Sequence, residues 1–168
     1  HDAKGRYLAP GFIDAHVHIE SSLVDPPSFA ALVVPHGTTT VIADPHEICN
    51  VCGLDGLDYM LERSDDLDLS VFFMIPSCVP ATAFEHAGAV MDASHLQKRI
   101  GLDRVLGLGE MMDTVGTVAS GKRILKKLDV AYRARKIIDG HAPGLGGLEL
   151  NAYAAAGINT DHECASAD

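Results

Sequence analysis

Residues 8–20 read LAPGFIDAHVHIE, and this stretch decides the fold that we expect for the chain. From Phe12 onward apolar and polar side chains alternate, and this period of two predicts a β-strand. Because residues two positions apart point the same way, the strand would place His16 and His18 on one face. Two imidazoles on a strand face beside carboxylates are typical of a metal site. A polar strand edge that binds no ion is the alternative interpretation.

Length and composition limit the class of protein. The 168 residues are 47% hydrophobic, as expected for one globular domain with its own core. A formal net charge of −10 argues against a nucleic-acid partner, and the apolar runs are too short for a membrane. The N-terminus lacks a signal-peptide pattern and the four cysteines lack disulfide-framework spacing, so we expect a cytoplasmic protein. Since the first residue is not Met, we also expect a piece of a longer polypeptide.

Apolar or β-branched runs alternate with amphipathic segments along the rest of the chain. The predicted strands after the first are residues 38–43, 69–75, 104–109, 136–140 and 157–160. The predicted helices are residues 26–34, 53–63, 94–100, 120–135 and 146–156. Alternation about every 25–30 residues is typical of βα units on a parallel sheet. We therefore predict an α/β fold, a partial TIM-type (β/α) barrel of about six βα units over residues 1–168.

Three local details follow from helix chemistry. Ser94 is expected to cap the helix over 94–100. Residues 111–119 are predicted to form a loop, and residues 80–90 fit either a loop or a short helix. In the helix over 120–135, Lys127 is expected to lie off the apolar stripe. That stripe consists of Ile124, Leu125, Leu128, Ala131 and Tyr132.

Ligand-type side chains collect where the predicted strands end. The first strand ends in His16 and His18, and later ends carry Glu110, His141 and His162. In a β/α barrel the carboxyl ends of all strands meet on one face, where active sites lie. Such a set could hold two ions, and a carboxylate shared between them fits the two-metal arrangement that activates a bridging water. Further polar residues at these ends are Asp44, His46, Glu47 and Glu163.

The segment 10–18, PGFIDAHVH, resembles the first-strand motif of the metal-dependent amidohydrolase superfamily. Further segments together resemble the branch of that superfamily that deaminates adenine. They are HIESS (18–22), ADPHEI (43–48), GEMM (109–112), DGHAPG (139–144) and DHEC (161–164). The resemblance covers essentially the whole chain, and the motifs are specific in combination.

The resemblance implies a role for each ligand-type residue. His16 and His18 would bind the first metal ion. His141 and His162 would bind the second. Glu110 would bridge the two ions, where most of the superfamily uses a carboxylated lysine. The ions would be manganese or iron, with zinc as the alternative, because imidazole and carboxylate ligands admit all three.

The resemblance also implies a substrate and further catalytic groups. Asp44, with His46 and Glu47, would line the pocket of a purine base. Asp44, Glu110 and Glu163 are the catalytic candidates, and Glu163 could instead face the barrel wall. The reaction would be hydrolytic deamination of adenine to hypoxanthine and ammonia by a metal-activated hydroxide.

Two other functions stay open, because only part of the superfamily's barrel is predicted here. The superfamily's catalytic aspartate at the end of strand eight lies beyond the six predicted strands. Residues 1–8 would be the remnant of a connection from a small β-sandwich domain. One alternative is a different cyclic amidohydrolase or deaminase of the same superfamily. The other is a non-catalytic metal-binding barrel piece, whose open strand edges would favour a homo-oligomer.

A second pattern in the sequence partly matches the zinc motif of another class of deaminase. Nucleobase deaminases of the cytidine-deaminase type carry H-x-E followed by P-C-x-x-C. Here His18-Ile19-Glu20 and Cys49-Asn50-Val51-Cys52 reproduce that order, but Ile48 stands where the proline belongs. The rival also leaves the histidines and the glutamate of the later strand ends unused, so we favour the barrel site.

Overall fold

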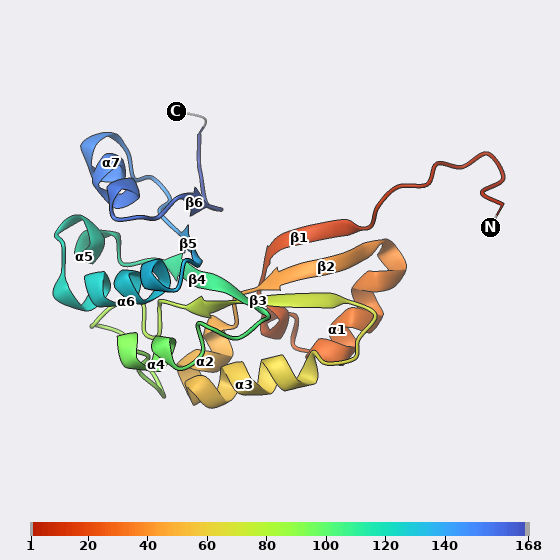
Figure 1. Cartoon of the computed structure of the whole chain (residues 1–168), viewed down its shortest axis with the longest axis horizontal. Coiled ribbons are helices and arrows are strands. Elements are labelled where there is room, and N and C mark those ends of the chain that lie inside the picture. Colours follow the sequence, from red (N-terminus) through yellow and green to blue (C-terminus); the bar gives the residue numbers. More distant parts are fainter. Residues whose placement is uncertain (1, 167–168) are drawn as a thin grey trace.

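The computed structural model describes residues 2–166, which form one parallel β-sheet curled into part of a barrel (Figure 1). The six strands are β1 (Phe12–Val17), β2 (Thr38–Ala43), β3 (Ser70–Pro76), β4 (Val105–Met111), β5 (Ile137–Gly140) and β6 (Thr160–Asp161). Each strand pairs in parallel with the next one along the chain. The predicted partial TIM-type barrel is therefore confirmed. Residues 1, 167 and 168 of the predicted domain lie outside the described residues.

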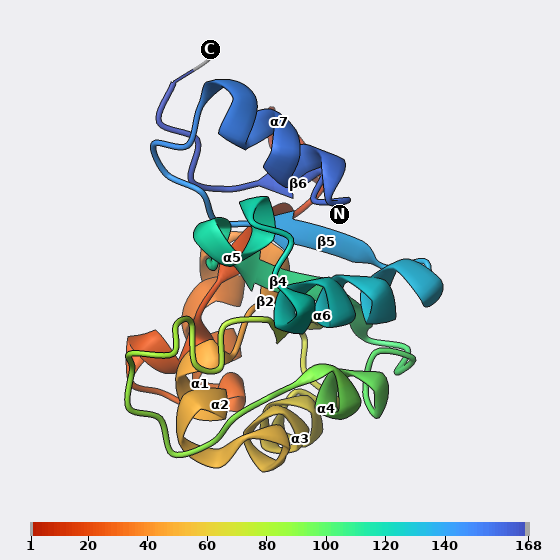
Figure 2. The same cartoon turned by 90° about the vertical axis from the view of Figure 1, so that its left-hand side faces the viewer.

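Helices occupy most of the connections between strands. They are α1 (Pro26–Val33), α2 (His46–Cys52), α3 (Leu54–Arg63), α4 (Ala93–Gln97), α5 (Thr114–Val118), α6 (Lys122–Arg133) and α7 (Gly147–Ala155), with 3₁₀ turns η1 (Ile19–Ser22) and η2 (Val34–His36). Figure 1 shows α1, α3 and α4 along one side of the sheet, and Figure 2 shows α6 beside β4 and β5. Within residues 2–166, no helix is long and apolar enough to cross a membrane.

The core lies between the central strands and the helices. Val41 of β2 and Phe73 and Ile75 of β3 are fully buried, as expected for the apolar runs of a parallel sheet. The edge strand β1 is different, because it pairs with β2 on one side only. Phe12 and Ile13 are 70% and 67% exposed, so β1 presents an apolar open edge.

Two predicted local details are wrong. Asp92, rather than Ser94, caps α4, because the Asp92 carboxylate accepts backbone N–H groups of the first turn. The predicted loop over 111–119 contains α5, which begins where the Asp113 side chain accepts a backbone N–H. The segment 80–90 contains turns and no helix, which settles the expectation left open there.

The buried face of α6 also differs from the prediction. Leu125 and Tyr132, which were expected in the apolar stripe, are 41% and 76% exposed. Lys127, which was expected outside the stripe, is only 1% exposed. Its Nζ atom donates a hydrogen bond to the backbone carbonyl of Ser77 at 2.5 Å. A specific tertiary partner therefore overrides the preference of lysine for solvent.

Candidate metal centre

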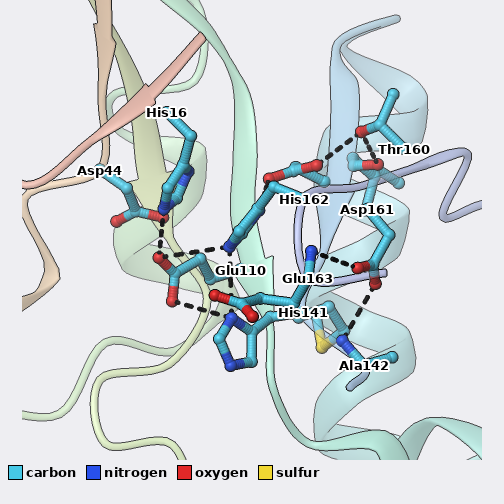
Figure 3. Close-up of polar contacts among 12 residues, drawn as sticks. His16, Asp44, Glu110, His141, Ala142, Thr160, Asp161, His162 and Glu163 are labelled. Carbon is cyan, nitrogen blue, oxygen red and sulfur yellow. Dashed lines mark hydrogen bonds and ion pairs between the residues drawn. The ribbon is translucent and has the colours of Figure 1, made fainter. Parts of the chain in front are cut away.

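Glu110, near the end of β4, lies among imidazoles from the ends of β1, β5 and β6 (Figure 3). Its Oε1 atom is 2.8 Å from Nε2 of His16 and 3.0 Å from Nε2 of His18. The two Nε2 atoms are themselves 3.1 Å apart. The predicted sharing of one strand face by these two histidines is thus present in the structure.

The other two predicted metal histidines lie near the same carboxylate. Nδ1 of His141 is 3.9 Å from Glu110 Oε2, and Nε2 of His162 is 3.9 Å from Glu110 Oε1. These two imidazole nitrogens lie 3.2 Å from each other. The ring of His162 also stacks on the ring of His16, with centroids 3.6 Å apart. All five residues predicted as metal ligands therefore meet at one place.

A break in the β4–β5 pairing directs the Glu110 side chain into this cluster. The strand register shifts between Leu108 and Met111, and Glu110 has a φ of +38°. Such irregularities are common beside active sites, because they re-aim a side chain out of the regular strand alternation. Here the irregularity buries the carboxylate, which is 1% exposed.

Outer hydrogen bonds orient two of the imidazoles. Nδ1 of His18 lies 2.7 Å from the backbone carbonyl of Asp44, and Nδ1 of His162 lies 2.8 Å from Oδ2 of Asp139. When Nδ1 donates these bonds, Nε2 of each ring is free to face a metal ion. Asp139 is absent from the predicted site residues. Its position at a strand end, two residues before His141, is the signal that could have indicated it.

The residues present fit a metal ion. Both Glu110 oxygens are buried and receive no aligned hydrogen bond from the described residues, although Nε2 of His16 and of His18 lies within 3.0 Å of Oε1. An ion with ligands at about 2.1 Å holds neighbouring ligand atoms about 3.0–3.4 Å apart. The separations among Glu110, His16 and His18 match that spacing closely. A buried carboxylate and imidazole nitrogens that converge at these separations are arranged as ligands of a common cation.

Electrostatics at the centre point the same way. Burial raises the pKa of Glu110, but the contacts with His16 and His18 outweigh it and hold that pKa well below its usual range. The Glu110 carboxylate in turn raises the pKa of His18 to about 9. The Glu110 carboxyl is therefore negative at neutral pH, as a metal ligand must be, whereas His18 must release its proton when a metal ion binds.

The predicted pocket residues Asp44, His46 and Glu47 lie beside the same carboxylate. Nδ1 of His46 is 3.4 Å from Glu110 Oε2 and 3.9 Å from Asp44 Oδ1. Oε2 of Glu47 is 3.6 Å from Nδ1 of His18. Asp44 is fully buried, and neither oxygen of its carboxylate has a hydrogen-bond partner among the described residues. Burial raises the pKa of Asp44 and lowers that of His46, so the structure favours the neutral form of both.

Glu163, the remaining predicted catalytic residue, is not joined to this cluster. Its side chain is exposed, and its backbone N–H donates to the Asp161 carboxylate at 2.8 Å. Within residues 2–166, no hydrogen bond or ion pair involves the Glu163 carboxylate. Its catalytic role stays a prediction.

The chain was compared with known proteins. A family model with the description "Amidohydrolase family" matches residues 7–168. "Adenine deaminase 2" of Desulfotalea psychrophila is 60% identical over 167 residues, which are 99% of this chain. "Adenine deaminase" of Clostridium acetobutylicum is 58% identical over 98% of this chain, and that of Geobacillus kaustophilus is 52% identical over 99%. The chain spans 29% of the length of each of these three relatives.

Proposed function

Because this chain belongs to the amidohydrolase family, we propose that its strand-end cluster is the metal-binding part of a hydrolytic active site. Enzymes of this family use divalent metal ions. His16 and His18 would hold one ion. His141 and His162 would hold a second, and Glu110 would bridge the two. The buried Glu110 carboxylate, with Nε2 of His16 and of His18 within 3.0 Å of its Oε1 atom, is the observation that carries this proposal.

Divalent ions supply a hydroxide nucleophile at neutral pH and stabilise negative charge that develops on a substrate. The chain's own residues prepare the place for them. Asp44 and Asp139 hold His18 and His162 by hydrogen bonds at Nδ1, so that the opposite nitrogens face the centre. The buried Asp44 carboxyl lies 3.9 Å from Nδ1 of His46. We propose that this pair serves proton transfer at the wall of the pocket.

We propose adenine as the substrate of the whole enzyme. Relatives named adenine deaminase share 52–60% identity with 96–100% of this chain, and that stretch contains every residue of the cluster. Water would add at C6 of the purine and the amino group would leave as ammonia, which gives hypoxanthine. Manganese or iron is the proposed metal, with zinc as the alternative, because imidazole and carboxylate ligands suit all three.

We also infer a cytoplasmic homo-oligomer in which residues 1–8 lead to a second small domain. Exposed side chains support the homo-oligomer and the second domain. Tyr7 and Leu8 are 102% and 96% exposed, and Phe12 on the open edge is 70% exposed. The N-terminal segment that precedes β1 extends away from the sheet (Figure 1). Such apolar groups are typical of surfaces that another segment or chain covers. The thiols of Cys49 and Cys78 are buried and free, as in proteins of a reducing compartment.

Turnover by the full-length, manganese-loaded protein tests the function. We expect hypoxanthine from adenine, and we expect Glu110→Gln to lower the rate more than about 100-fold, beyond the effect of an outer-shell change. Glu62→Gln on the exposed face of α3 is the control and should keep the rate.

Three other outcomes would contradict the proposal in distinct ways. Turnover of dihydroorotate without turnover of adenine would indicate another cyclic amidohydrolase. Bound metal without any turnover would leave a metal-binding domain. Normal turnover by Glu110→Gln would show that the reaction does not need a bridging carboxylate at position 110.

A further inference from the structure

Glu110 holds a backbone conformation that its own side chain does not favour. Its φ of +38° lies in the left-handed region, which residues with a Cβ atom rarely adopt. Such a conformation persists only when neighbouring groups fix it. Since the direction of the Glu110 carboxylate depends on this backbone, the groups that fix it also determine the metal centre.

Ser77 donates hydrogen bonds to the backbone on both sides of the Glu110 Cα atom. This residue follows the last residue of β3 and is buried. Its N–H donates to the carbonyl of Gly109 at 3.1 Å, and its Oγ donates to the carbonyl of Glu110 at 2.6 Å. These carbonyls belong to the peptide planes before and after Glu110. One serine therefore restrains both planes whose rotation would turn the carboxylate away.

Lys127 in turn fixes Ser77. Its ammonium, which extends from α6, donates to the Ser77 carbonyl at 2.5 Å. Among residues 2–166, no carboxylate lies within ion-pair distance of this ammonium. A buried cation without an anionic partner is costly, so the carbonyl of Ser77 is the specific group that holds it there. The backbone N–H, the backbone carbonyl and the hydroxyl of Ser77 are thus all engaged.

We propose that Ser77 is a positioning residue that holds Glu110 ready for metal, and that Lys127 anchors Ser77. Neither residue is among the proposed metal ligands; Ser77 acts on the backbone of β4, and Lys127 acts on the backbone of Ser77. This inference rests on the metal centre proposed above. It extends the site to α6, a helix that carries no ligand.

A matched pair of serine variants tests the proposal by metal affinity. Ser64 is as buried as Ser77, its Oγ donates to the Met60 carbonyl at 2.7 Å, and its own carbonyl accepts from Arg104. It lies at the end of α3, away from the cluster. Ser77→Ala should raise the dissociation constant for Mn²⁺ at least about 10-fold, whereas Ser64→Ala should leave it within about twofold. Both variants should lose a comparable amount of thermal stability, because both lose one buried hydrogen bond.

The measurement is a Mn²⁺ titration of the full chain followed by electron paramagnetic resonance, with circular dichroism to establish folding. If Ser77→Ala does not fold, Lys127→Met decides, and it should weaken Mn²⁺ binding about threefold or more. If Ser77→Ala folds and binds Mn²⁺ with unchanged affinity, its role is merely structural and the inference is overturned. If Ser77→Ala does not fold, unchanged Mn²⁺ affinity in Lys127→Met overturns the inference in the same way. Failure of the unchanged chain to bind Mn²⁺ would overturn the proposed function, and this inference with it.

Discussion

At the scale of single residues, Lys127 shows how far a tertiary contact can depart from a sequence pattern. Helical periodicity places it among the solvent-facing lysines of α6, yet it is buried against the Ser77 carbonyl. Asp139 and Ser77 escape prediction for the same reason, because their importance depends on contacts with His162 and Glu110, far away in the chain. The convergence of the five metal-type residues was predictable, since strand ends converge in any β/α barrel; their role as ligands stays a prediction.

Burial, with the help of Arg123, lowers the pKa of Lys127 to about 8, and this shift predicts a pH effect on stability. In the unfolded chain the lysine keeps its proton up to about pH 10.5. Between these values the unfolded state binds more protons, so stability should rise with pH. From pH 7 to pH 10.5 the unchanged protein should gain up to about 3 kcal/mol relative to Lys127→Met.

Urea unfolding of both proteins at the two pH values measures this difference. The comparison removes the effects of the cysteines and tyrosines, which titrate in the same range in both proteins. Equal changes in the two proteins would show that Lys127 does not lose its proton early in the folded state.

At the scale of elements, strands were predicted better than short helices. The β-branched run over 38–43 gives β2 with the same bounds, because burial in a parallel sheet demands such a run. Neither α2 nor α5 was predicted, because helices of seven and five residues are too short to show a helical period. A capping side chain such as Asp113 and packing against other elements decide such segments.

Tyr153 of α7 connects two of the strands that carry the site. Its hydroxyl donates to the Met111 carbonyl at 2.6 Å and accepts the His141 N–H at 3.1 Å. Tyr153→Phe should therefore lower the free energy of unfolding by about 1–3 kcal/mol, because two buried backbone groups lose a partner. Urea denaturation measures the loss, with the exposed Tyr132→Phe as a control that should change nothing. If Tyr153→Phe is as stable as the control, the two hydrogen bonds of the Tyr153 hydroxyl do not stabilise the link between the ends of β4 and β5.

At the scale of the whole molecule, the sheet formed by residues 2–166 has two open edges, β1 and β6. Figure 1 shows an extended N-terminal segment that leads into β1. The apolar side chains of Phe12 and Ile13 at the start of β1 are exposed. Unpaired strand edges with apolar side chains promote pairing between chains. The chain should therefore associate in solution, and Ile13→Lys should shift it towards monomer.

Light scattering after gel filtration gives the masses that check this expectation. Leu148→Lys is the matched control, because Leu148 is also exposed but lies on α7. A monomeric unchanged chain, or equal association of both variants, would show that the β1 edge is not what joins the chains.

The central claim is that histidines from the ends of β1, β5 and β6 share two divalent ions through Glu110. Manganese content, determined by elemental analysis after anaerobic loading and dialysis, tests it most directly. We predict about two manganese ions per chain, magnetically coupled in the electron paramagnetic resonance spectrum, as a shared carboxylate requires. In Glu110→Gln the coupling and most of the metal should be lost. Two uncoupled ions, or the same coupled pair in Glu110→Gln, would contradict the claim.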